Sequence, residues 1–341
     1  MFIQEDMKLK IYYNIFKLRN DWERLSKENA SLTPFQYFNY NKNLFWDRWL
    51  NIFKTRLVPV FVSISDSNKV IMIAPLLKTL RNNYFMLGDI QGCGLTDFIY
   101  LNSLSDDQIL ECISLLRNYC KYIHVGRLSC TSRFFEVYNR SNEIGGVQRD
   151  VLINVKFGDD YDEYYKALTK HVRQNLRTSY NRLKSNNIEY SFDVIDNSSM
   201  TSAIWNGVSE IYCKRQKDAY GASGVWMDLK NKYLKHDSIS LRYNDNLFCA
   251  ILKYGNEIAA VLMGLINYEK TMIIVPRLAI NTDFYHYSPG NQLVNECIKF
   301  LIEKTKVRNL DLSRGTEQYK YMMGGEEYQT ANFDIVKKNK P

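Results

Sequence analysis

The chain has 341 residues, of which 45% are hydrophobic and 24% charged, and its formal charge is +8. This length suits two domains of middling size, and the composition excludes a disordered chain. The best apolar run, Ala259 to Ile266, has the length of a buried strand and is too short for a transmembrane helix. The positive charge favours an anionic partner without choosing among a coenzyme, RNA and a membrane surface.

Two further features favour a cytoplasmic protein. The chain begins with Met1-Phe2-Ile3-Gln4-Glu5-Asp6, which places acidic residues where a signal peptide has Lys or Arg. The seven cysteines are odd in number and form no close metal-type pair, so we interpret them as reduced thiols. His-Glu-x-x-His and Walker lysine motifs are missing from the sequence, and no metal cofactor is expected.

The first half of the chain has the pattern of a small mixed sheet. Two β-rich runs, Val58 to Ile64 and Val70 to Leu77, surround a polar Ser-Asp-Ser-Asn turn and predict a hairpin. Further strands are predicted at 84–87, 97–101 and 122–125, with a helix from Ser105 to Tyr119 before the last of them.

A long helical segment from about Asp160 to Ser185 lies between the two halves. Apolar residues recur at helical spacing on one side, namely Leu168, Val172, Leu176, Tyr180 and Leu183. Basic residues follow another side, namely Lys166, Lys170, Arg173, Arg177 and Lys184. The pattern predicts one packed side and one side that faces solvent or an anion. Helices are also predicted from Met200 to Lys214 and from Trp226 to Lys235.

The second half repeats the order of elements found in the first. Strands are predicted for Leu247 to Tyr254, Glu257 to Ile266, Thr271 to Ile280 and Asn309 to Leu312, with a helix from Pro289 to about Thr305 before the last strand. Either one α/β module has been duplicated, or the order is simply one that mixed sheets commonly show.

The sharpest local signal is the segment Ser288-Pro289-Gly290-Asn291-Gln292, between a strand and a helix. Ser288 suits the N-cap and Pro289 the first helical position, while Gly290 permits close approach to the backbone. Free N–H groups and the positive end of the helix dipole then form a site for the phosphates of a coenzyme. The alternative is an ordinary capped helix.

Three segments carry a family resemblance. They are Thr33-Pro34-Phe35 followed by Trp46 and Trp49, the basic stretch Val172-Arg173-Gln174-Asn175-Leu176-Arg177, and the stretch from Asp311 to Lys320. Together with the element order, they resemble the Fem/CelD-like group of GNAT-fold acyltransferases, which includes proteins of cell-envelope and polysaccharide biosynthesis. The spaced glycines and basic residue of the common acetyltransferase phosphate loop are reduced here to Ser288-Pro289-Gly290.

The resemblance implies an α/β (α+β) fold of two tandem GNAT-like modules, each a mixed, mainly antiparallel sheet flanked by helices. We expect residues 1–155 to form the first module, which shapes the acceptor site. Residues 156–341 would form the second, which binds the acyl donor and carries out catalysis.

In the implied fold, the strand from Met272 to Ile280 separates from the strand from Asn309 to Leu312, and the donor carbonyl lies in the gap. A backbone N–H near Leu278 or Ala279 would stabilise the oxyanion. Ser288 to Gln292 would hold the pyrophosphate.

Three side chains are catalytic candidates. Asp311 and Glu317 are the carboxylates best placed to accept a proton from the amine, and Tyr319 to return one to the leaving thiolate. The structural alternatives are a satisfied strand-end group for Asp311, a favourable charge in a first helical turn for Glu317, and a core aromatic for Tyr319.

Four further residues are candidates for binding phosphate or substrate. Arg173 and Arg177 are four apart and would reach one phosphate-rich ligand, unless they form a solvated face. His286 lies in the loop before the predicted phosphate site. Lys320 would hold a phosphate or a carboxylate, or would lie solvated on its helix.

The sequence therefore predicts an N-acyltransferase that moves an acyl group from acyl-CoA, with acetyl-CoA as the first choice, to an amino sugar or similar small amine. The acceptor would belong to polysaccharide or cell-envelope biosynthesis, and nucleic acid is not the expected partner. One alternative is a Fem-type transferase that uses aminoacyl-tRNA and a peptidoglycan precursor. Another is a non-catalytic binding module of the same fold.

Overall fold

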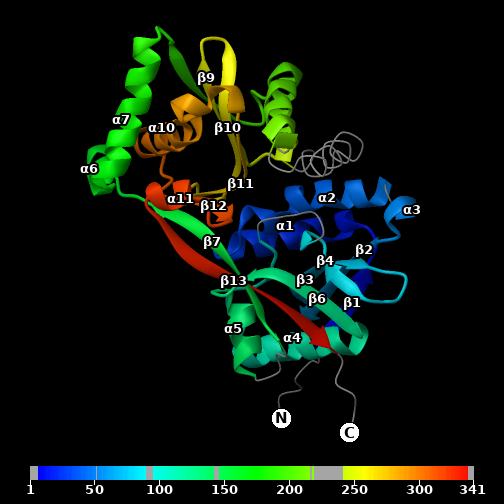
Figure 1. The fold of residues 1–341 in the computed structure, drawn as a ribbon. Helices are drawn as coiled ribbons and strands as arrows, with labels where there is room; N and C mark the ends of the chain where they lie inside the picture. The colour runs from blue at the N-terminus through cyan, green and yellow to red at the C-terminus, as the bar shows by residue number, and fades with distance from the viewer. Residues whose placement is uncertain are drawn as a thin grey trace. The chain divides into compact units, whose positions relative to one another are not determined.

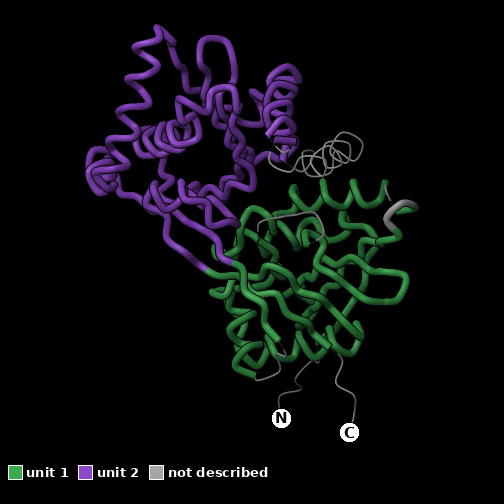
Figure 2. The backbone as a smooth tube through the Cα atoms, in the orientation of Figure 1, with its two compact units in different colours: residues 1–150, 329–341 green, residues 151–328 purple. Residues whose placement is uncertain are grey.

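The computed structural model describes residues 7–50, 52–89, 95–141, 146–215, 217–218 and 241–336. The predicted helix from Trp226 to Lys235 lies outside these residues. The chain forms two compact units: unit 1 contains Met1–Asp150 and Gln329–Pro341, and unit 2 contains Val151–Tyr328 (Figure 2).

Unit 1 contains a mixed sheet with helices (Figure 1). Its sheet has the strand order β1-β2-β3-β4-β6-β13, and β5 pairs with β3. Only the β4–β6 pair on this path is parallel. The elements are β1 (Lys8–Tyr12), η1 (Ile15–Leu18), α1 (Arg19–Glu28), η2 (Pro34–Gln36), α2 (Phe38–Leu50), α3 (Ile52–Thr55), β2 (Val58–Asp66), β3 (Lys69–Lys78), β4 (Tyr84–Met86), β5 (Ile99–Tyr100), α4 (Asp106–Tyr119), β6 (Tyr122–Ser129), α5 (Arg133–Arg140) and the end of β13 (Gly325–Val336).

Unit 2 repeats this strand order as β8-β9-β10-β11-β12-β7, again with one parallel pair, β11–β12. Its elements are most of β7 (Gln148–Lys156), α6 (Tyr161–Ala167), α7 (Lys170–Ser185), β8 (Tyr190–Ile195), β9 (Leu247–Tyr254), β10 (Glu257–Ile266), β11 (Met272–Ile280), η4 (Thr282–Tyr287), α10 (Pro289–Lys304), β12 (Asn309–Arg314), α11 (Gln318–Met322) and the start of β13. Residues 202–215 are also helical. The predicted fold class is confirmed.

The last strand of each sheet comes from an unexpected part of the chain. Residues 152–156 of β7 pair with β12 and form the last strand in the sheet of unit 2, although they precede most of that unit in the chain. Residues 329–336 of β13 return to unit 1 and pair with β6. Ala331, Phe333 and Ile335 there alternate with more exposed residues and enter the unit 1 core. The compact units therefore differ from the expected division at residue 155.

A shared irregularity supports the view that one module has been duplicated. In unit 1 the register between β6 and β13 shifts beside Arg127, whose φ is 56°. In unit 2 the register between β12 and β7 shifts beside Ser313, whose φ is 57°. Each shift is a β-bulge on the second strand of the parallel pair, where a bulge redirects the strand.

The long helix predicted between the halves is divided in two. α6 ends at Ala167, and α7 begins after Thr169, whose side chain accepts a hydrogen bond from the Val172 amide at 3.4 Å. Such an N-cap satisfies an amide that has no partner inside the helix, so a new helix can start there. The predicted apolar side is confirmed: Val172, Leu176 and Leu183 are buried against the sheet and α10.

Candidate active site

The two parallel strands of unit 2 separate after a short ladder. Their pairing covers Met272 to Ile274 on β11 and Asn309 to Asp311 on β12, while β11 continues to Ile280. Beyond this point β11 is bulged opposite Gly264, and the register with β10 shifts there. A Cβ atom on Gly264 would lie 2.9 Å from the Ile274 carbonyl oxygen. Glycine thus permits the bulge that carries β11 away from β12.

The hydrogen-bond ladder indicates which amides of β11 face this separation. The amide of Asn281 donates to the carbonyl of Ala259 on β10 at 2.8 Å. Because main-chain groups alternate in direction along an antiparallel strand, the amide of Ala279 also points to β10. The amide of Leu278 points to the opposite side, on which β12 lies. Of the two predicted amides, Leu278 is the one that faces the separation.

The start of α10 differs in part from the predicted capped helix. Ser288 occupies the N-cap position, but it has left-handed φ and ψ angles of 54° and 50°, and its side chain caps no amide. Pro289 has no N–H, and the amide of Gln292 donates to the Ser288 carbonyl at 3.3 Å. The predicted anion site therefore depends on the amides of Gly290 and Asn291, both in half-buried residues.

Gln292, which was predicted to contact the coenzyme, is a core residue. Its side chain is fully buried, accepts a hydrogen bond from the Tyr254 hydroxyl at 2.9 Å, and donates to the Ser179 hydroxyl at 2.9 Å. It also donates to the Tyr287 carbonyl at 3.2 Å. These bonds tie α10 to α7, to β9 and to the preceding loop. The side chain of Gln292 thus fixes the start of α10 and does not face solvent.

The basic residues near α10 are also rearranged relative to the prediction. The guanidinium of Arg173 donates to the carbonyls of Lys166 and Leu168, both at 2.5 Å, and so satisfies the end of α6. Arg177 is exposed. Arg182 lies next to the α10 start, because it donates to the carbonyl of His286 in the preceding η4 at 2.9 Å. His286 itself is exposed, and the sequence pattern did not single out Arg182.

Asp311 is the last residue of β12 that pairs with β11. Leu310 and Leu312 enter the core beneath α10, so alternation places the Asp311 side chain on the other face of the sheet. The carboxylate accepts a bond from the Tyr328 hydroxyl and another from the Ser313 amide at 2.7 Å. Burial raises the pKa of Asp311 to about 6. Tyr328, which the sequence did not indicate, is its direct partner.

Lys320 and Glu317 brace the loop between β12 and α11. The Lys320 ammonium is buried and donates to the carbonyls of Ser313 at 3.3 Å, Arg314 at 2.5 Å and Gly315 at 3.2 Å. It also forms an ion pair with Glu317 at 3.0 Å. Neither predicted alternative for Lys320, a ligand contact or a solvated side chain, describes this arrangement. Glu317, which is more than half exposed, is held by a structural cation.

Tyr319 lies partly buried against the core of unit 2. Burial raises the pKa of Tyr319, so its hydroxyl stays protonated at neutral pH. Partial burial and a protonated hydroxyl fit both predicted roles, a proton donor and a core aromatic. Its main-chain carbonyl accepts a bond from the Met323 amide at 3.1 Å and helps to end α11.

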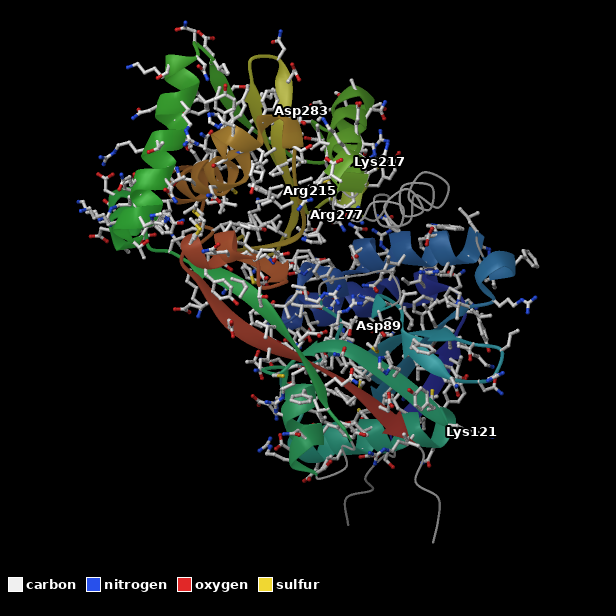
Figure 3. The ribbon with its side chains drawn as sticks, viewed as in Figure 1. Asp89, Lys121, Arg215, Lys217, Arg277 and Asp283 are labelled. Atoms are coloured by element: carbon white, nitrogen blue, oxygen red, sulfur yellow. The ribbon has the colours of Figure 1, made fainter. Side chains whose placement is uncertain are left out.

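A second polar group lies at the far end of β11. Arg277, labelled in Figure 3, is stacked over the Tyr212 ring, with 4.6 Å between the guanidinium carbon and the ring centre. Lys214 donates to Asn281 at 3.0 Å and to Asp283 at 2.5 Å. These contacts fasten the helix at 202–215 to β11 and η4, and they hold the strand end that carries Leu278.

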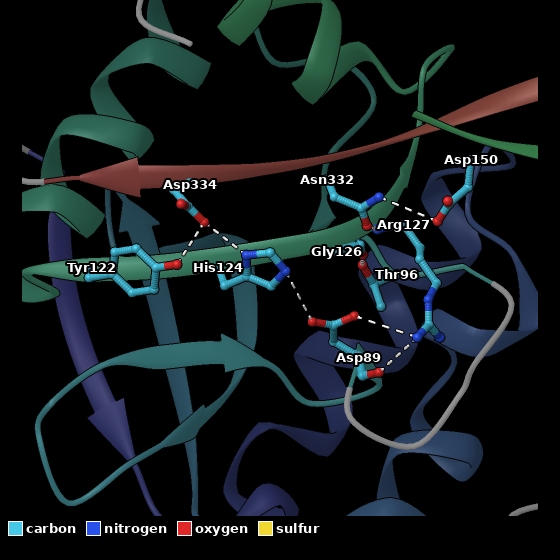
Figure 4. Close-up of polar contacts among 9 residues, drawn as sticks. All are labelled: Asp89, Thr96, Tyr122, His124, Gly126, Arg127, Asp150, Asn332 and Asp334. Atoms are coloured by element: carbon cyan, nitrogen blue, oxygen red, sulfur yellow. Dashed lines mark hydrogen bonds and ion pairs between the residues drawn. The ribbon is translucent and has the colours of Figure 1, made fainter. Parts of the chain in front are cut away.

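In unit 1, side chains of the protein itself lie beside the corresponding pair of parallel strands, β4 and β6. β4 and β6 pair only at Tyr84–Phe85 with Ile123–His124. Asp89 then reaches β6, where its carboxylate lies 3.6 Å from His124 and 4.0 Å from Arg127 (Figure 4). A Cβ atom on Gly126 would lie 2.2 Å from an Asp89 oxygen. Gly126 is therefore what lets the Asp89 carboxylate sit against the strand.

A wider network surrounds Asp89 in unit 1. His124 lies 2.8 Å from Asp334 on β13, and the Tyr122 hydroxyl donates to the same carboxylate at 2.9 Å. The Arg127 amide donates to the Asn332 side chain at 2.8 Å. The network joins β6 to β13, so we interpret it as structural.

An open pocket of about 470 Å³ lies at the end of the unit 2 sheet that carries η4. Tyr254 and Phe284 line it, together with two carboxylates, Glu189 and Glu257. The carboxylates disfavour a phosphate there. The phosphate groups of a donor would therefore be favoured on the Arg182 side of the α10 start.

Two searches of the described residues bear on partners. In the part of the chain that is described, no helix combines the length and the apolar character needed to cross a bilayer. Over the same residues, His, Cys, Asp and Glu side chains form no group of three or more that could hold a metal ion.

Comparison with known proteins agrees with this geometry. A model described as "Acetyltransferase (GNAT) domain" matches residues 170–321, which lie in unit 2. Among the curated proteins, the sequence has no match.

Solved structures share the fold of the whole chain. FemX is 8% identical, with a TM-score of 0.62, over 96% of this chain and 97% of that chain. L-PGS from Bacillus licheniformis is 11% identical, with a TM-score of 0.52, over 94% and 92%. A tandem GNAT protein from the clavulanic acid biosynthesis pathway is 8% identical, with a TM-score of 0.50, over 98% and 100%. These similarities show that the chain shares its fold with these proteins, one of which is described as a tandem GNAT protein, and that a GNAT domain model matches within unit 2.

Proposed function

We propose that this protein is an N-acyltransferase that moves an acyl group from acyl-CoA to an amine, with the reaction in unit 2. The acceptor would be an amino sugar or similar amine of polysaccharide or cell-envelope biosynthesis. The observation that carries the proposal is the position of Asp311. Its buried carboxylate, with a pKa of about 6, lies where β11 and β12 separate, and the Leu278 amide faces the same separation.

The donor fits the residues present. The amide of Leu278 would donate a hydrogen bond to the acyl oxygen and stabilise the negative charge that develops there. The amides of Gly290 and Asn291, with the positive end of α10 behind them, would hold the diphosphate. Arg182 is the neighbouring cation, since it already contacts the loop before α10. Coenzyme A supplies the activated thioester.

Asp311 is the best placed proton acceptor for the attacking amine. At neutral pH a carboxyl group with a pKa of about 6 is mostly ionised and close to the best strength for accepting a proton. Tyr328 donates to Asp311 and would relay the proton if the amine does not touch the carboxylate. Glu317 is a weaker candidate because Lys320 already neutralises it. Tyr319, protonated and partly buried, would return a proton to the leaving thiolate.

A second candidate function is transfer of an amino acid from aminoacyl-tRNA. Two observations favour it. The fold is similar to FemX over almost the whole chain. In addition, Lys170, Arg177 and Lys184 on α7 are exposed, and such a basic surface suits phosphate contacts with RNA. The same separation in unit 2 would then receive an aminoacyl ester in place of a thioester.

Product analysis with a panel of donors tests the proposal. Purified protein is incubated with amino sugars and with acetyl-, succinyl- or longer acyl-CoA, and amide products are measured by mass spectrometry. Calorimetry measures donor binding in parallel. We expect an amide product from at least one acyl-CoA, and its loss in Asp311→Asn. Failure to bind any acyl-CoA removes the proposal. Turnover with aminoacyl-tRNA alone supports the second candidate, and no turnover with any donor supports a non-catalytic binding module.

A further inference from the structure

Unit 1 carries a row of exposed hydrophobic residues that no part of the proposed function uses. Trp46, Trp49 and Leu50 belong to α2 and Phe53 belongs to α3, and we call these four residues the aromatic stripe. Trp46 and Leu50 are four residues apart, as are Trp49 and Phe53. Trp46 and Trp49 are 44% and 45% exposed, Leu50 is 77% exposed, and Phe53 is 94% exposed. Isolated exposed apolar residues are common, but a contiguous row of this kind marks an interaction surface.

Aromatic residues next to the stripe pack against its two tryptophans. The buried ring of Phe45 stacks on Trp49, with 5.9 Å between ring centres and 28° between planes. Phe16, which is 41% exposed, lies 6.0 Å from Trp46 and widens the surface. Aromatic rings pack against one side of each tryptophan and fix its position, and the other side is exposed.

The charge around the stripe has one dominant sign. From Lys42 to Arg56 the sequence holds four basic residues and one acidic residue, Asp47. Asp47 and Arg48 are both buried, with their charged groups 4.0 Å apart, whereas Arg56 and the neighbouring Lys17 are exposed. The surface thus combines tryptophan, leucine and phenylalanine with basic residues at the edges. This combination is typical of helices that lie in the headgroup region of an anionic membrane.

We propose that the aromatic stripe docks unit 1 on the surface of an anionic lipid bilayer. The tryptophans would lie at headgroup depth, Leu50 and Phe53 would enter the acyl boundary, and the basic residues would contact lipid phosphates. Because each group suits a different depth of one interface, a bilayer fits the surface better than a purely apolar protein partner. The docking is peripheral and independent of acyl transfer, and it would bring the protein to acceptors held at a membrane.

Vesicle flotation with the full-length protein tests this proposal. Vesicles of phosphatidylcholine alone are compared with vesicles that also contain phosphatidylglycerol. We expect binding to the anionic vesicles, and weaker binding as salt shortens the range of the charges. The double variant Trp49→Ala, Phe53→Ser should bind at least about tenfold more weakly, because it removes apolar side chains that would enter the membrane.

Leu80→Ser is the matched control, because Leu80 belongs to the same unit and is 72% exposed but lies between β3 and β4. Its binding should equal that of the parent protein. Thermal unfolding of each variant shows that loss of binding is not loss of folding. Equal binding by the stripe variant and the parent overturns the proposal, as does a parent protein that ignores anionic vesicles at low salt.

Fluorescence supplies a second readout. Lipids brominated on their acyl chains quench tryptophans that enter the membrane, and Trp22 and Trp205 are buried reporters elsewhere in the chain. We expect quenching in the parent protein and its loss in Trp46→Phe, Trp49→Phe. If the stripe variant instead abolishes a concentration-dependent dimer and no quenching occurs, the stripe is an interface between copies and the membrane proposal is wrong.

Discussion

Units 1 and 2 contain the same pair of parallel strands, β4 with β6 and β11 with β12, but place different groups beside them. In unit 1, Asp89 reaches back from the chain after β4 and lies against Gly126, between His124 and Arg127. In unit 2, Asp311 belongs to the second strand itself, and the amide of Leu278 faces the separation. One fold therefore supports an internal ion-pair network in one unit and a candidate site in the other, because the residues, and not the topology, determine the chemistry.

The largest effect is expected from Asp311→Asn. Asparagine keeps one oxygen that can accept from the Ser313 amide, and its NH2 group can donate to the Tyr328 hydroxyl, but it cannot take a proton. The transfer rate should therefore fall by about 100-fold or more. Burial already disfavours the charged form of Asp311, so unfolding at pH 8 should occur at the same or a higher temperature. Steady-state kinetics and thermal melts check both. Asp334→Asn in unit 1 is the matched control, and an equal loss of activity there would break the comparison.

The converse test is Asp89→Ala in unit 1. The change leaves His124 and Arg127 without the carboxylate between them, in a part of the unit that is mostly buried. We expect the free energy of unfolding to fall by about 2–4 kcal/mol, with the activity of the folded fraction unchanged. Chemical denaturation and assays at low temperature measure these quantities. A strong loss of activity without loss of stability would assign chemistry to unit 1.

The pH dependence should follow Asp311. Its folded pKa of about 6 is raised above the ordinary value of 3.8, so the active carboxylate is lost as pH falls through 6. At pH 5, kcat/KM should be about tenfold below its plateau, and Asp311→Asn should lack this inflection.

The raised pKa of Asp311 also makes the stability of the protein depend on pH. A raised carboxyl pKa means that folding favours the protonated form, so this contribution is present at low pH and is lost as pH rises from 3.8 through 6. Asp311→Asn removes it, so the stability gap between the variant and the parent should move in favour of the variant over this range. A gap that stays constant from pH 4 to 7 would contradict the buried ionisation.

The smallest effect is expected from Gly290→Ala. A Cβ atom there would lie 3.2 Å from the Ile280 side chain, which is tight but adjustable. It would also narrow the approach to the amide at the start of α10, so KM for the donor should rise a few-fold, roughly 1 kcal/mol, with kcat unchanged. Gly158→Ala, whose Cβ would have no neighbour within 4 Å, is the control. A change in kcat without a change in KM would be inconsistent with a binding role.

Local patterns in the sequence were enough to place most elements of unit 2. β9 and β10 begin and end where their β-rich runs predicted, and α10 begins at Pro289 as expected. The pairing of β7 with β12 and of β13 with β6 was not predicted, because pairing between strands far apart in the chain leaves no local signal. The alternation of Ala331, Phe333 and Ile335 did offer a sign of a half-buried strand in β13.

The site was only partly predictable for a similar reason. Asp311 was proposed because the fold implied by the resemblance places it at the end of the strand that separates. Its partner Tyr328 lies on a strand that the sequence did not reveal. Arg173 was assigned to ligand binding from its spacing, and Gln292 from its place at the start of a helix. Neither signal tells whether a polar side chain turns inward. The side chain of Gln292 belongs to a buried polar network. Arg173 donates to carbonyls at the end of α6, and the continuous periodicity of the sequence did not show that α6 and α7 are separate helices.

Amide hydrogen exchange with and without acetyl-CoA tests the central claim most directly, because it locates the donor in one unit. We expect slower exchange at 276–282 of β11 and at 288–292 of α10, and unchanged exchange at 84–89 and 122–129 of unit 1. Protection confined to unit 1, or no protection in either unit at saturating donor, would contradict the assignment of the reaction to the separation between β11 and β12.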